Sequence, residues 1–461
     1  MRLAEIATYV NEKISSSNIT LDQYVTTDSL LQDKRGREYA QNLPPVTTNL
    51  IHYQPGDVLV ANIRPYLKKV WLADCEGGAS SDVLVLRAKN ANDTTFVYAL
   101  LMQDSFYDYA MKGAKGSKMP RGDKDQIMRY EFPIFSPEQR KDVGKFITDI
   151  ESKIAVNRQI NDNLEAMAKQ LYDYWFVQFD FPNEEGKPYK SSGGKMIRNE
   201  KLKREIPEGW VDAKIKDIAN TYSGGTPTST NQDYYIGGKI PWINSGELNN
   251  PVITETSNYI TDLGLNNSSA KLYPQNTILV ALYGATAGKV SLLSFEACSN
   301  QAVCGVMPTD DNMTTYIRYH LASLYEHFII LSSGSARDNI SQDTIKNTIL
   351  PIPRIEILKK YEDIVKPIVD KIIANQKEVE NLTKQRDELL PLLMNGQVSV
   401  NYHLSVLQVV ANIGKFSYFI GLFLPSACRF EVDSPSFIFN GRGIRLPHFV
   451  FTGHLASQGR Y

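Results

Sequence analysis

The residues best suited to chemistry lie in one basic segment, residues 112–124. Its basic and hydroxyl side chains are Lys112, Lys115, Ser117, Lys118, Arg121 and Lys124, and its one acid is Asp123. Glycines among them allow the backbone to approach a ligand closely. Side chains of these types contact phosphate oxygens and base edges in nucleic acids. The segment therefore predicts a nucleic-acid contact, although a solvated, lysine-rich loop is the simpler interpretation.

A second segment corresponds to the first at an offset of 218 residues, which carries Gly116-Ser117 onto Gly334-Ser335. Its candidate side chains are Ser333, Ser335, Arg337 and Asn339. Arg121 and Arg337 could each form a bidentate bond to guanine, which is worth ~1–3 kcal/mol of discrimination between bases. The recurrence shifts the balance from a solvated loop towards a pair of nucleic-acid contacts.

Motifs for catalysis are not evident. The sequence has no GxxxxGK[ST] loop, no GxGxxG after a strand, and no HExxH pairing among its six histidines. The four cysteines, Cys75, Cys298, Cys304 and Cys428, form no CxxC pair and no zinc spacing. A formal net charge of −1 creates no global attraction for a polyanion, so a nucleic acid must be bound through local patches. We therefore expect a protein that binds rather than reacts, with no metal site.

The cellular setting follows from composition. The cysteine pattern favours a reducing compartment, and the first residues lack the apolar core of a signal peptide. No stretch approaches the ~18 apolar residues that a membrane-spanning helix needs. We expect a cytoplasmic protein with no membrane partner.

The elements that must position the candidate residues are themselves repeated. The run Lys153–Gln159 returns as Lys371–Lys377 at the offset of 218, and Val60-Ala61 returns as Val280-Ala281 at an offset of 220. Solenoid repeats recur every ~20–50 residues, so this much longer period indicates two whole domains, each with its own core. The β-branched runs Asp57–Ala61 and Asp82–Leu86 predict buried strands.

Each repeat ends in a predicted long helix. Ser136, Pro137 and Gln139 form a helix-start signal, and apolar residues then recur every three or four positions to about Phe179. The apolar positions are Ile147, Ile150, Ile154, Ile160, Leu164, Met167, Leu171 and Tyr174. Such a helix would be roughly 60 Å long. The second helix covers about residues 355–395; Pro367 should kink it or mark its true start, and Gly396 should end it.

The two apolar stripes predict antiparallel pairing of the helices. Asn157 and Asn375 occupy equivalent places on them. They are either buried residues that fix the helix register or solvent-facing residues, and the sequence favours neither. The predicted boundaries are a first domain at 1–135, a helix at 136–180, a polar linker or mobile loop at 181–204, a second domain at 205–353, a helix at 354–396 and an atypical tail at 397–461.

The order of short motifs resembles a known family. The motifs are Ile206-Pro207-Glu208-Gly209-Trp210, Ser223-Gly224-Gly225-Thr226-Pro227-Thr228, Gly237–Ile243, Ala281–Val290, Asn300–Val303, Gly334–Ile340 and Pro351-Ile352-Pro353. Their succession resembles the target recognition domain of the specificity subunit of bacterial type I restriction–modification enzymes, and Leu164–Phe176 resembles the family's central conserved helix. The resemblance spans roughly residues 1–400, but the first half lacks the Gly-Gly-Thr-Pro and Ile-Pro-Trp-Ile runs.

The resemblance implies an α+β fold. Two globular target recognition domains would each be followed by a long helix, with the two helices packed as an antiparallel coiled coil. Each domain would read one half of a split double-stranded DNA target, and the helices would set the spacing. The subunit itself would be non-catalytic.

The resemblance also implies partners. These are two methyltransferase (M) subunits, which hold S-adenosylmethionine, and restriction/motor (R) subunits, which use ATP and Mg; no cofactor is expected in this chain. The residues predicted to dock the M subunits are Leu164, Met167, Leu171, Trp175, Leu382 and Leu389. Thr226, in the Ser-Gly-Gly-Thr-Pro run, joins the predicted DNA contacts. The alternative is a pseudo-dimeric scaffold that joins proteins through its helices without DNA specificity.

Overall fold

The computed structural model describes residues 1–333, 339–401, 407–411 and 428–431, and within these the side chains of 1–330 and 339–400. The chain divides into two compact units. Unit 1 comprises Met1–Ser152 and Lys384–Tyr461, and unit 2 comprises Lys153–Thr383. The predicted tail lies largely outside the described residues. Of it, β21 (Val398–Asn401) pairs antiparallel with β22 (Leu407–Ala411), which pairs parallel with β23 (Cys428–Glu431).

Unit 1 is built on two four-stranded sheets. The first has the order β1 (Ala7–Tyr9), β8 (Val83–Ala88), β5 (Val58–Ala61), β6 (Val70–Leu72), with every neighbouring pair antiparallel. The second has the order β2 (Lys13–Ser15), β4 (Asn49–Tyr53), β7 (Gly77–Ala79), β3 (Tyr24–Val25). All four residues of β5 are buried, because both faces of this strand are covered. The predicted strands at 57–61 and 82–86 are therefore confirmed.

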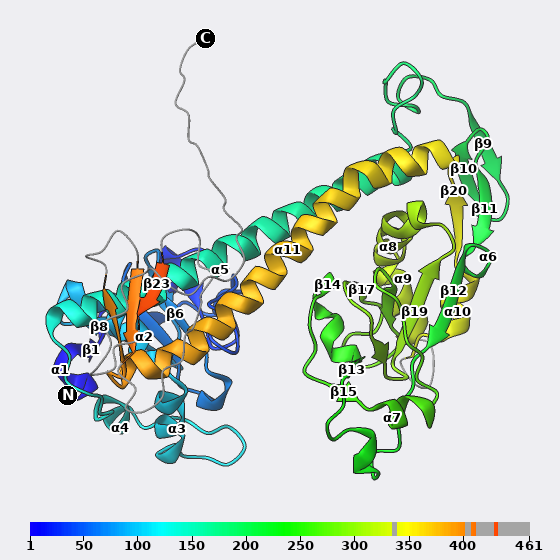
Figure 1. Cartoon of the computed structure of the whole chain (residues 1–461). Helices are drawn as coiled ribbons and strands as arrows, with labels where there is room; N and C mark the ends of the chain where they lie inside the picture. The colour runs from blue at the N-terminus through cyan, green and yellow to red at the C-terminus, as the bar shows by residue number, and fades with distance from the viewer. Residues whose placement is uncertain (334–338, 402–406, 412–427, 432–461) are drawn as a thin grey trace, which may run out of the picture. The chain divides into compact units, whose positions relative to one another are not determined.

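Short helices complete unit 1. They are α1 (Leu3–Ile6), α2 (Thr94–Leu101), α3 (Asp104–Lys112) and α4 (Lys124–Met128). Helix α2 packs on β5, β6 and β8 (Figure 1). A Cβ atom on Gly144 of α5 (Pro137–Tyr172) would lie 2.4 Å from the Thr95 hydroxyl, so only glycine lets α5 approach α2 this closely.

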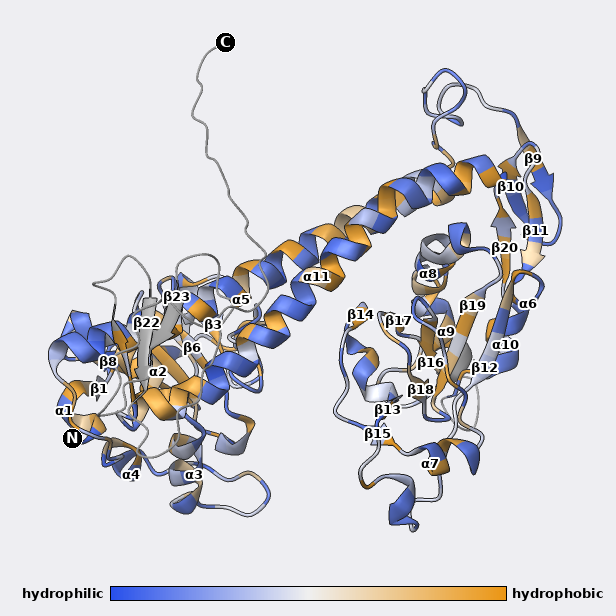
Figure 2. Cartoon of the chain, in the orientation of Figure 1, coloured by the Kyte–Doolittle hydropathy of each residue, from blue (hydrophilic) through white to orange (hydrophobic). Residues whose placement is uncertain are grey.

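Unit 2 contains a larger sheet with the order β12 (Ala219–Ser223), β19 (Val303–Pro308), β16 (Ile278–Ala281), β17 (Val290–Leu293), β14 (Val252–Ile253). Its first four strands have the connectivity of the first sheet of unit 1, since β12, β19, β16 and β17 take the places of β1, β8, β5 and β6. The central strand β16 is buried throughout and strongly apolar (Figure 2). The same chain path thus produces the same sheet twice.

The remaining elements of unit 2 surround this sheet. The strands are β13 (Ile240–Ile243), β15 (Tyr259–Ile260) and β18 (Cys298–Ser299) in one sheet, β9 (Met196–Asn199) with β10 (Arg204–Pro207), and β11 (Val211–Lys214) with β20 (Ile349–Ile352). The helices are α6 (Ile215–Ile218), α7 (Asp262–Asn266), α8 (Thr314–Ser323), α9 (Tyr325–Ser333) and α10 (Gln342–Asn347). Helix α8 packs on β17 and β19. Within the predicted linker at 181–204 the structure contains β9, and the Phe181 ring stacks on that of Tyr189 with 4.7 Å between centroids.

The two long helices are present. Helix α5 covers Pro137–Tyr172 and continues as a π-helical turn at Asp173–Val177, and α11 covers Ile355–Met394 (Figure 1). The predicted start is confirmed, because the backbone N–H of Gln139 donates to Ser136 Oγ and that of Ser136 donates to Gln139 Oε1. Gly396 adopts φ +69° directly beyond α11, as a helix stop requires. Pro367 does not begin the helix; it is exposed, and α11 runs through it.

The buried line of α5 differs from the predicted stripe. Ile147, Ile150 and Ile154 are buried, but the line continues through Asn157, Asn161 and Ala168, which are also buried. The predicted stripe members Ile160, Met167 and Tyr174 are instead 38, 48 and 37% exposed. The prediction followed the large apolar residues, whereas the buried face also includes two hydrogen-bonded asparagines and an alanine.

The two asparagines whose environment was left open are buried in unit 2. Asn375 Nδ2 donates to Asn161 Oδ1 at 3.0 Å, and Asn161 Nδ2 donates to the Ile372 carbonyl at 3.2 Å. Asn157 Nδ2 donates to Glu378 Oε2 at 3.0 Å. Buried amides of this kind fix helix register, because a shift of one turn would leave them unpaired.

Candidate nucleic-acid interface

The predicted basic segment lies at one end of the first sheet of unit 1. The chain leaves β5 through Asn62 and Ile63, and these residues meet the segment directly. The N–H of Gly122 donates to the Asn62 carbonyl at 3.0 Å, the N–H of Arg64 donates to the Pro120 carbonyl at 2.7 Å, and Ile63 bridges to Arg121. The segment is thus fixed to the end of the sheet by backbone bonds.

The segment itself folds into a tight turn. Lys115 and Arg121 exchange two backbone hydrogen bonds, of 2.9 and 3.0 Å, and Gly116 between them adopts φ +93°. All six predicted side chains of unit 1 are exposed, namely Lys112, Lys115, Ser117, Lys118, Arg121 and Lys124. The backbone of the turn is therefore held in place while all six side chains are accessible to solvent.

Two of the cations have acidic neighbours. Arg121 Nη2 lies 2.7 Å from Asp82 Oδ1, and Lys115 Nζ lies 3.9 Å from Asp123 Oδ2. Hydrogen bonds from the N–H of Gln126, with smaller help from the positive charge of Lys115, lower the pKa of the Asp123 carboxyl. Part of Arg121 is therefore used to hold the turn, and its guanidinium is less free than the sequence suggested.

Unit 2 has a corresponding arrangement. Leu282 follows β16, as Asn62 follows β5, and the N–H of Ile340 donates to its carbonyl at 2.7 Å. Tyr283 bridges to Asn339, as Ile63 bridges to Arg121. The N–H of Leu282 donates to the Ala302 carbonyl at 2.8 Å. The repeated sheets thus carry Arg121 and Asn339 at the same end.

Thr226 and Asn339 are both exposed at this end of unit 2. Thr226 Oγ1 donates to Gln301 Oε1, and Gln301 precedes the residue that bonds Leu282. Thr226 is thus bonded to the chain beside Ala302, and Asn339 is bridged to Tyr283, the residue after Leu282. Ser335 and Arg337 lie outside the described residues, and the side chain of Ser333 does as well, so their roles stay predictions.

One cation at this end of unit 1 is absent from the predicted set. Arg64 adjoins Pro120 through its backbone bond, and its side chain is half-buried. It was missed because it lies outside the basic segment in sequence. The signal that could have found it is the repeat itself, since the offset of 220 places Arg64 opposite Gly284.

The residues predicted to dock M subunits have mixed environments. Trp175, Leu382 and Leu389 are no more than 4% exposed, and the Trp175 ring lies 5.7 Å from that of Tyr361 within unit 2. Leu164 and Leu171 are half-buried against the same core. Met167 is 48% exposed. Because five of these six side chains are buried or half-buried, they serve chiefly to pack the chain against itself.

A buried polar network joins the globular part of unit 2 to α5. Arg318, 2% exposed, donates to both carboxylate oxygens of Glu165 at 2.8 and 3.0 Å and to the Pro251 carbonyl at 3.1 Å. Nearby, Tyr172 and His320 Nδ1 form a hydrogen bond of 2.9 Å. Burial, with a smaller contribution from the positive charge of Arg204, lowers the pKa of His320 to about 4. This histidine is therefore neutral at physiological pH.

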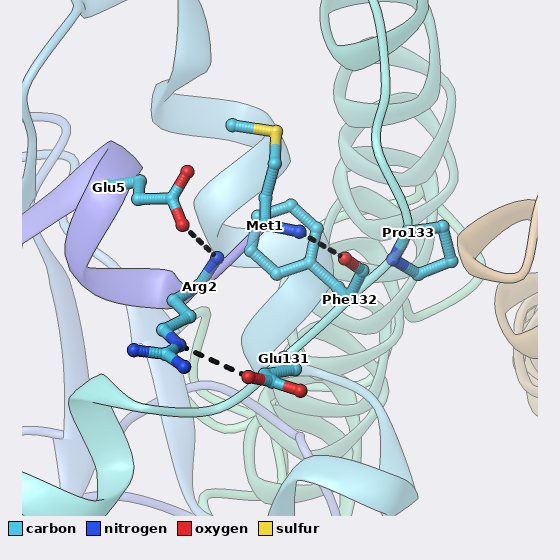
Figure 3. A pocket seen from close by; sticks show the side chains of 6 residues that line it. All are labelled: Met1, Arg2, Glu5, Glu131, Phe132 and Pro133. Atoms are coloured by element: carbon cyan, nitrogen blue, oxygen red, sulfur yellow. Dashed lines mark hydrogen bonds and ion pairs between the residues drawn. The ribbon is translucent and has the colours of Figure 1, made fainter.

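A shallow pocket in unit 1 contains no buried polar network like that around Arg318. It is lined by Met1, Arg2, Glu5, Glu131, Phe132 and Pro133 (Figure 3). Its charged groups already have partners: Arg2 Nε lies 3.1 Å from Glu131 Oε1, and the N-terminal amine donates to the Phe132 carbonyl at 2.8 Å. In the part of the chain that the structure describes, no cluster of His, Cys, Asp or Glu could hold a metal, and no helix is long and apolar enough to cross a membrane.

Comparisons with known proteins point to one family. Residues 207–384 match the family model described as the type I restriction modification DNA specificity domain. The chain is 28% identical to the type I restriction enzyme MjaIX specificity subunit of Methanocaldococcus jannaschii, over 66% of this chain and 69% of the relative. It is 25% identical to the HindI specificity subunit of Haemophilus influenzae, over 74% and 86%.

A solved structure shares the fold. The crystal structure of the S subunit of a type I restriction–modification system from M. genitalium matches with a TM-score of 0.55 and 14% sequence identity. The match covers 86% of this chain and 95% of that one.

Proposed function

Because the chain belongs to the family of type I restriction–modification specificity subunits, we propose that it recognises a split double-stranded DNA sequence, with each unit reading one half. Subunits of this family are the non-catalytic components of their complexes. The observation that carries the proposal is the exposed, backbone-anchored basic turn at one end of the unit 1 sheet, with Asn339 at the same end of the unit 2 sheet. A duplicated fold with duplicated contacts suits a target with two separated parts, as in dimeric readers.

The long helices are proposed to form an antiparallel coiled coil that sets the distance between the two half-targets. In unit 2, Asn157 contacts Glu378 while Asn161, further along α5, contacts Asn375, earlier on α11. The order of these contacts supports antiparallel pairing. In unit 1, Arg386 Nη1 lies 2.6 Å from Glu151 Oε1, which supports the same pairing there.

Helix α5 is also proposed to dock the two M subunits. Val156, Ile160, Met167 and Tyr174 are 37 to 51% exposed and recur at steps of four and seven, so they share one face. Exposed apolar residues in a line along a helix are typical of a protein-binding face. Of the six residues originally predicted to dock M subunits, Met167 lies on this face. The M subunits would hold S-adenosylmethionine, and the R subunits would supply ATP- and Mg-dependent activity.

The DNA proposal is tested by comparing the methylated sequences of cells with and without this gene. We expect one split, asymmetric methylated motif to disappear with the gene. If every methylated motif is retained, the proposal is wrong for this chain. A second measurement separates a DNA reader from a protein scaffold: binding of the purified chain to random duplex DNA across a salt series. A reader should lose affinity steeply with salt because phosphate contacts release counterions, whereas a scaffold should not.

A further inference from the structure

Two basic residues in the turn that follows β5, beside the basic segment, adopt a backbone conformation that is normally found at glycine. Arg64 has φ +53° and Lys68 has φ +51°, both left-handed. At the offset of 220, the corresponding residues of unit 2 are Gly284 at φ +85° and Gly288 at φ +80°. The conformation is therefore a property of the turn after the central strand. Unit 1 tolerates the cost of two non-glycine residues in it, and strain of this kind concentrates at functional sites.

Lys68 has a structural explanation. Its Nζ lies 3.0 Å from Asp104 Oδ2, and the other carboxylate oxygen of Asp104 lies 2.9 Å from Lys34 Nζ. These ion pairs attach the turn that follows β5 to α3. The Lys68 side chain therefore stabilises the fold in a way that glycine could not.

Arg64 has no such explanation. Its Nε is buried without a hydrogen-bond partner, and its guanidinium makes no ion pair within the residues that the structure describes. Its backbone N–H donates to Pro120 within the basic segment, so the side chain starts beside that segment. Burial lowers the pKa of Lys69, and the charge of Arg64 adds a smaller contribution in the same direction, which Asp28 and Glu38 oppose. A guanidinium with a buried, unpartnered Nε gains hydrogen bonds when an electron-rich partner such as a base edge approaches it.

We propose that Arg64 is a specificity-determining residue of unit 1 that reads the edge of a guanine in the half-target of that unit. This inference rests on the proposed DNA-reading function. Phosphates are alike in both half-targets but base edges differ, so a side chain kept in one unit and replaced by glycine in the other fits a base contact. Arginine bonds guanine O6 and N7 in bidentate fashion. Arg121, tied to Asp82, is the less available of the two arginines.

The test uses cells in which the gene carries Arg64→Gly, Lys68→Gly or Arg64→Lys, with methylation measured at every genomic sequence related to the target. Arg64→Gly should reduce discrimination at one position of one half-target by about 10- to 100-fold and leave the other half unchanged. The turn accepts glycine in unit 2, so the melting temperature of the purified variant should be unchanged or higher. Lys68→Gly is the matched control: it relieves the same strain but should leave base preference unaltered.

Arg64→Lys keeps the charge without the planar fork, so it should lose discrimination while keeping most of the affinity. This variant also carries the test if Arg64→Gly does not accumulate. Uniform loss of methylation at all sequences, loss in both halves, or unchanged preference in the Arg64 variants would overturn the inference. If the wild-type chain directs no split motif at all, the proposed function fails first; if it does and the Arg64 variants retain it, only the role of Arg64 is wrong.

Discussion

The ion pair between Glu165 of α5 and Arg318 of α8 decides how firmly the globular part of unit 2 is held on its helix. Arg318 is 2% exposed and Glu165 is 28% exposed at the side chain. The guanidinium also donates to the Tyr319 hydroxyl at 2.9 Å. Replacing Glu165 by alanine would leave a buried positive charge with neutral acceptors only.

The expected cost follows from this burial. Removing one partner of a buried pair typically destabilises a protein by ~3–5 kcal/mol. Because Glu165 is partly exposed and two neutral acceptors remain, we expect the lower end, about 3 kcal/mol. For a unit of roughly 150–250 residues, each kcal/mol shifts the melting temperature by ~2–4 °C, so the decrease should be ~6–12 °C.

A double-mutant cycle measures the pair itself. The variants are Glu165→Ala, Arg318→Met and the double substitution, each unfolded by urea and followed by tryptophan fluorescence. Trp175, Trp210 and Trp242 lie in unit 2 and Trp71 lies in unit 1, so the signal reports mainly on unit 2. The double variant should be more stable than Glu165→Ala alone, because it removes the unpaired charge. A cost below ~1 kcal/mol for Glu165→Ala, or additive effects, would refute the reasoning.

Three further predictions follow from single groups. The pKa of His320 is ~6.5 in the unfolded state and about 4 in the folded state. As the pH falls the unfolded state therefore binds the proton first, and the free energy of unfolding should decrease by ~2–3 kcal/mol between pH 6.5 and 4. Urea unfolding of His320→Gln should lack this decrease, and a pH profile equal to that of the wild type would contradict the explanation. Asn375→Leu should cost ~1–3 kcal/mol because it leaves the buried Asn161 Oδ1 without a donor, and the double variant Asn161→Leu with Asn375→Leu should recover part of this cost in thermal unfolding. A double variant as unstable as the sum of the single variants would exclude this explanation. Lys118→Ala should weaken binding to all duplexes alike and reduce the salt slope by about 1, and a sequence-selective effect would instead make Lys118 a base contact.

Much of the scaffold could be predicted from sequence because it depends on local signals. The Ser136 cap and the Gly396 stop use side-chain and backbone chemistry within a few residues of the helix end, and both are present as expected. The predicted buried face of α5 was partly wrong because it depends on residues that are distant in sequence. Whether Asn161 is buried depends on Asn375, 214 residues away, which completes its hydrogen bonds. Hydrophobic periodicity does not register a polar residue whose partner lies so far along the chain.

The candidate site was predictable only where charge is concentrated in sequence. Five basic residues between 112 and 124 indicated the turn, and the structure exposes all of them. The commitment of Arg121 to Asp82 needed the fold, because 39 residues separate them. The left-handed backbone of Arg64 is likewise invisible in the sequence of unit 1 alone. Only the glycine at the corresponding position of unit 2 indicates it.

The contrast between buried strand and exposed turn explains how one fold can carry two different readers. β5 and β16 are both fully buried, so their sequences, Val-Leu-Val-Ala and Ile-Leu-Val-Ala, remain nearly the same. The turns that follow them face solvent and have diverged, with Arg64 in one and Gly284 in the other. A substitution within the buried strand disturbs close packing and is therefore costly. In the exposed turn, the only requirement that both units share is the left-handed backbone conformation. Base preference can therefore change at this position without refolding the unit, which is why Arg64→Gly should alter the sequence read while leaving stability intact.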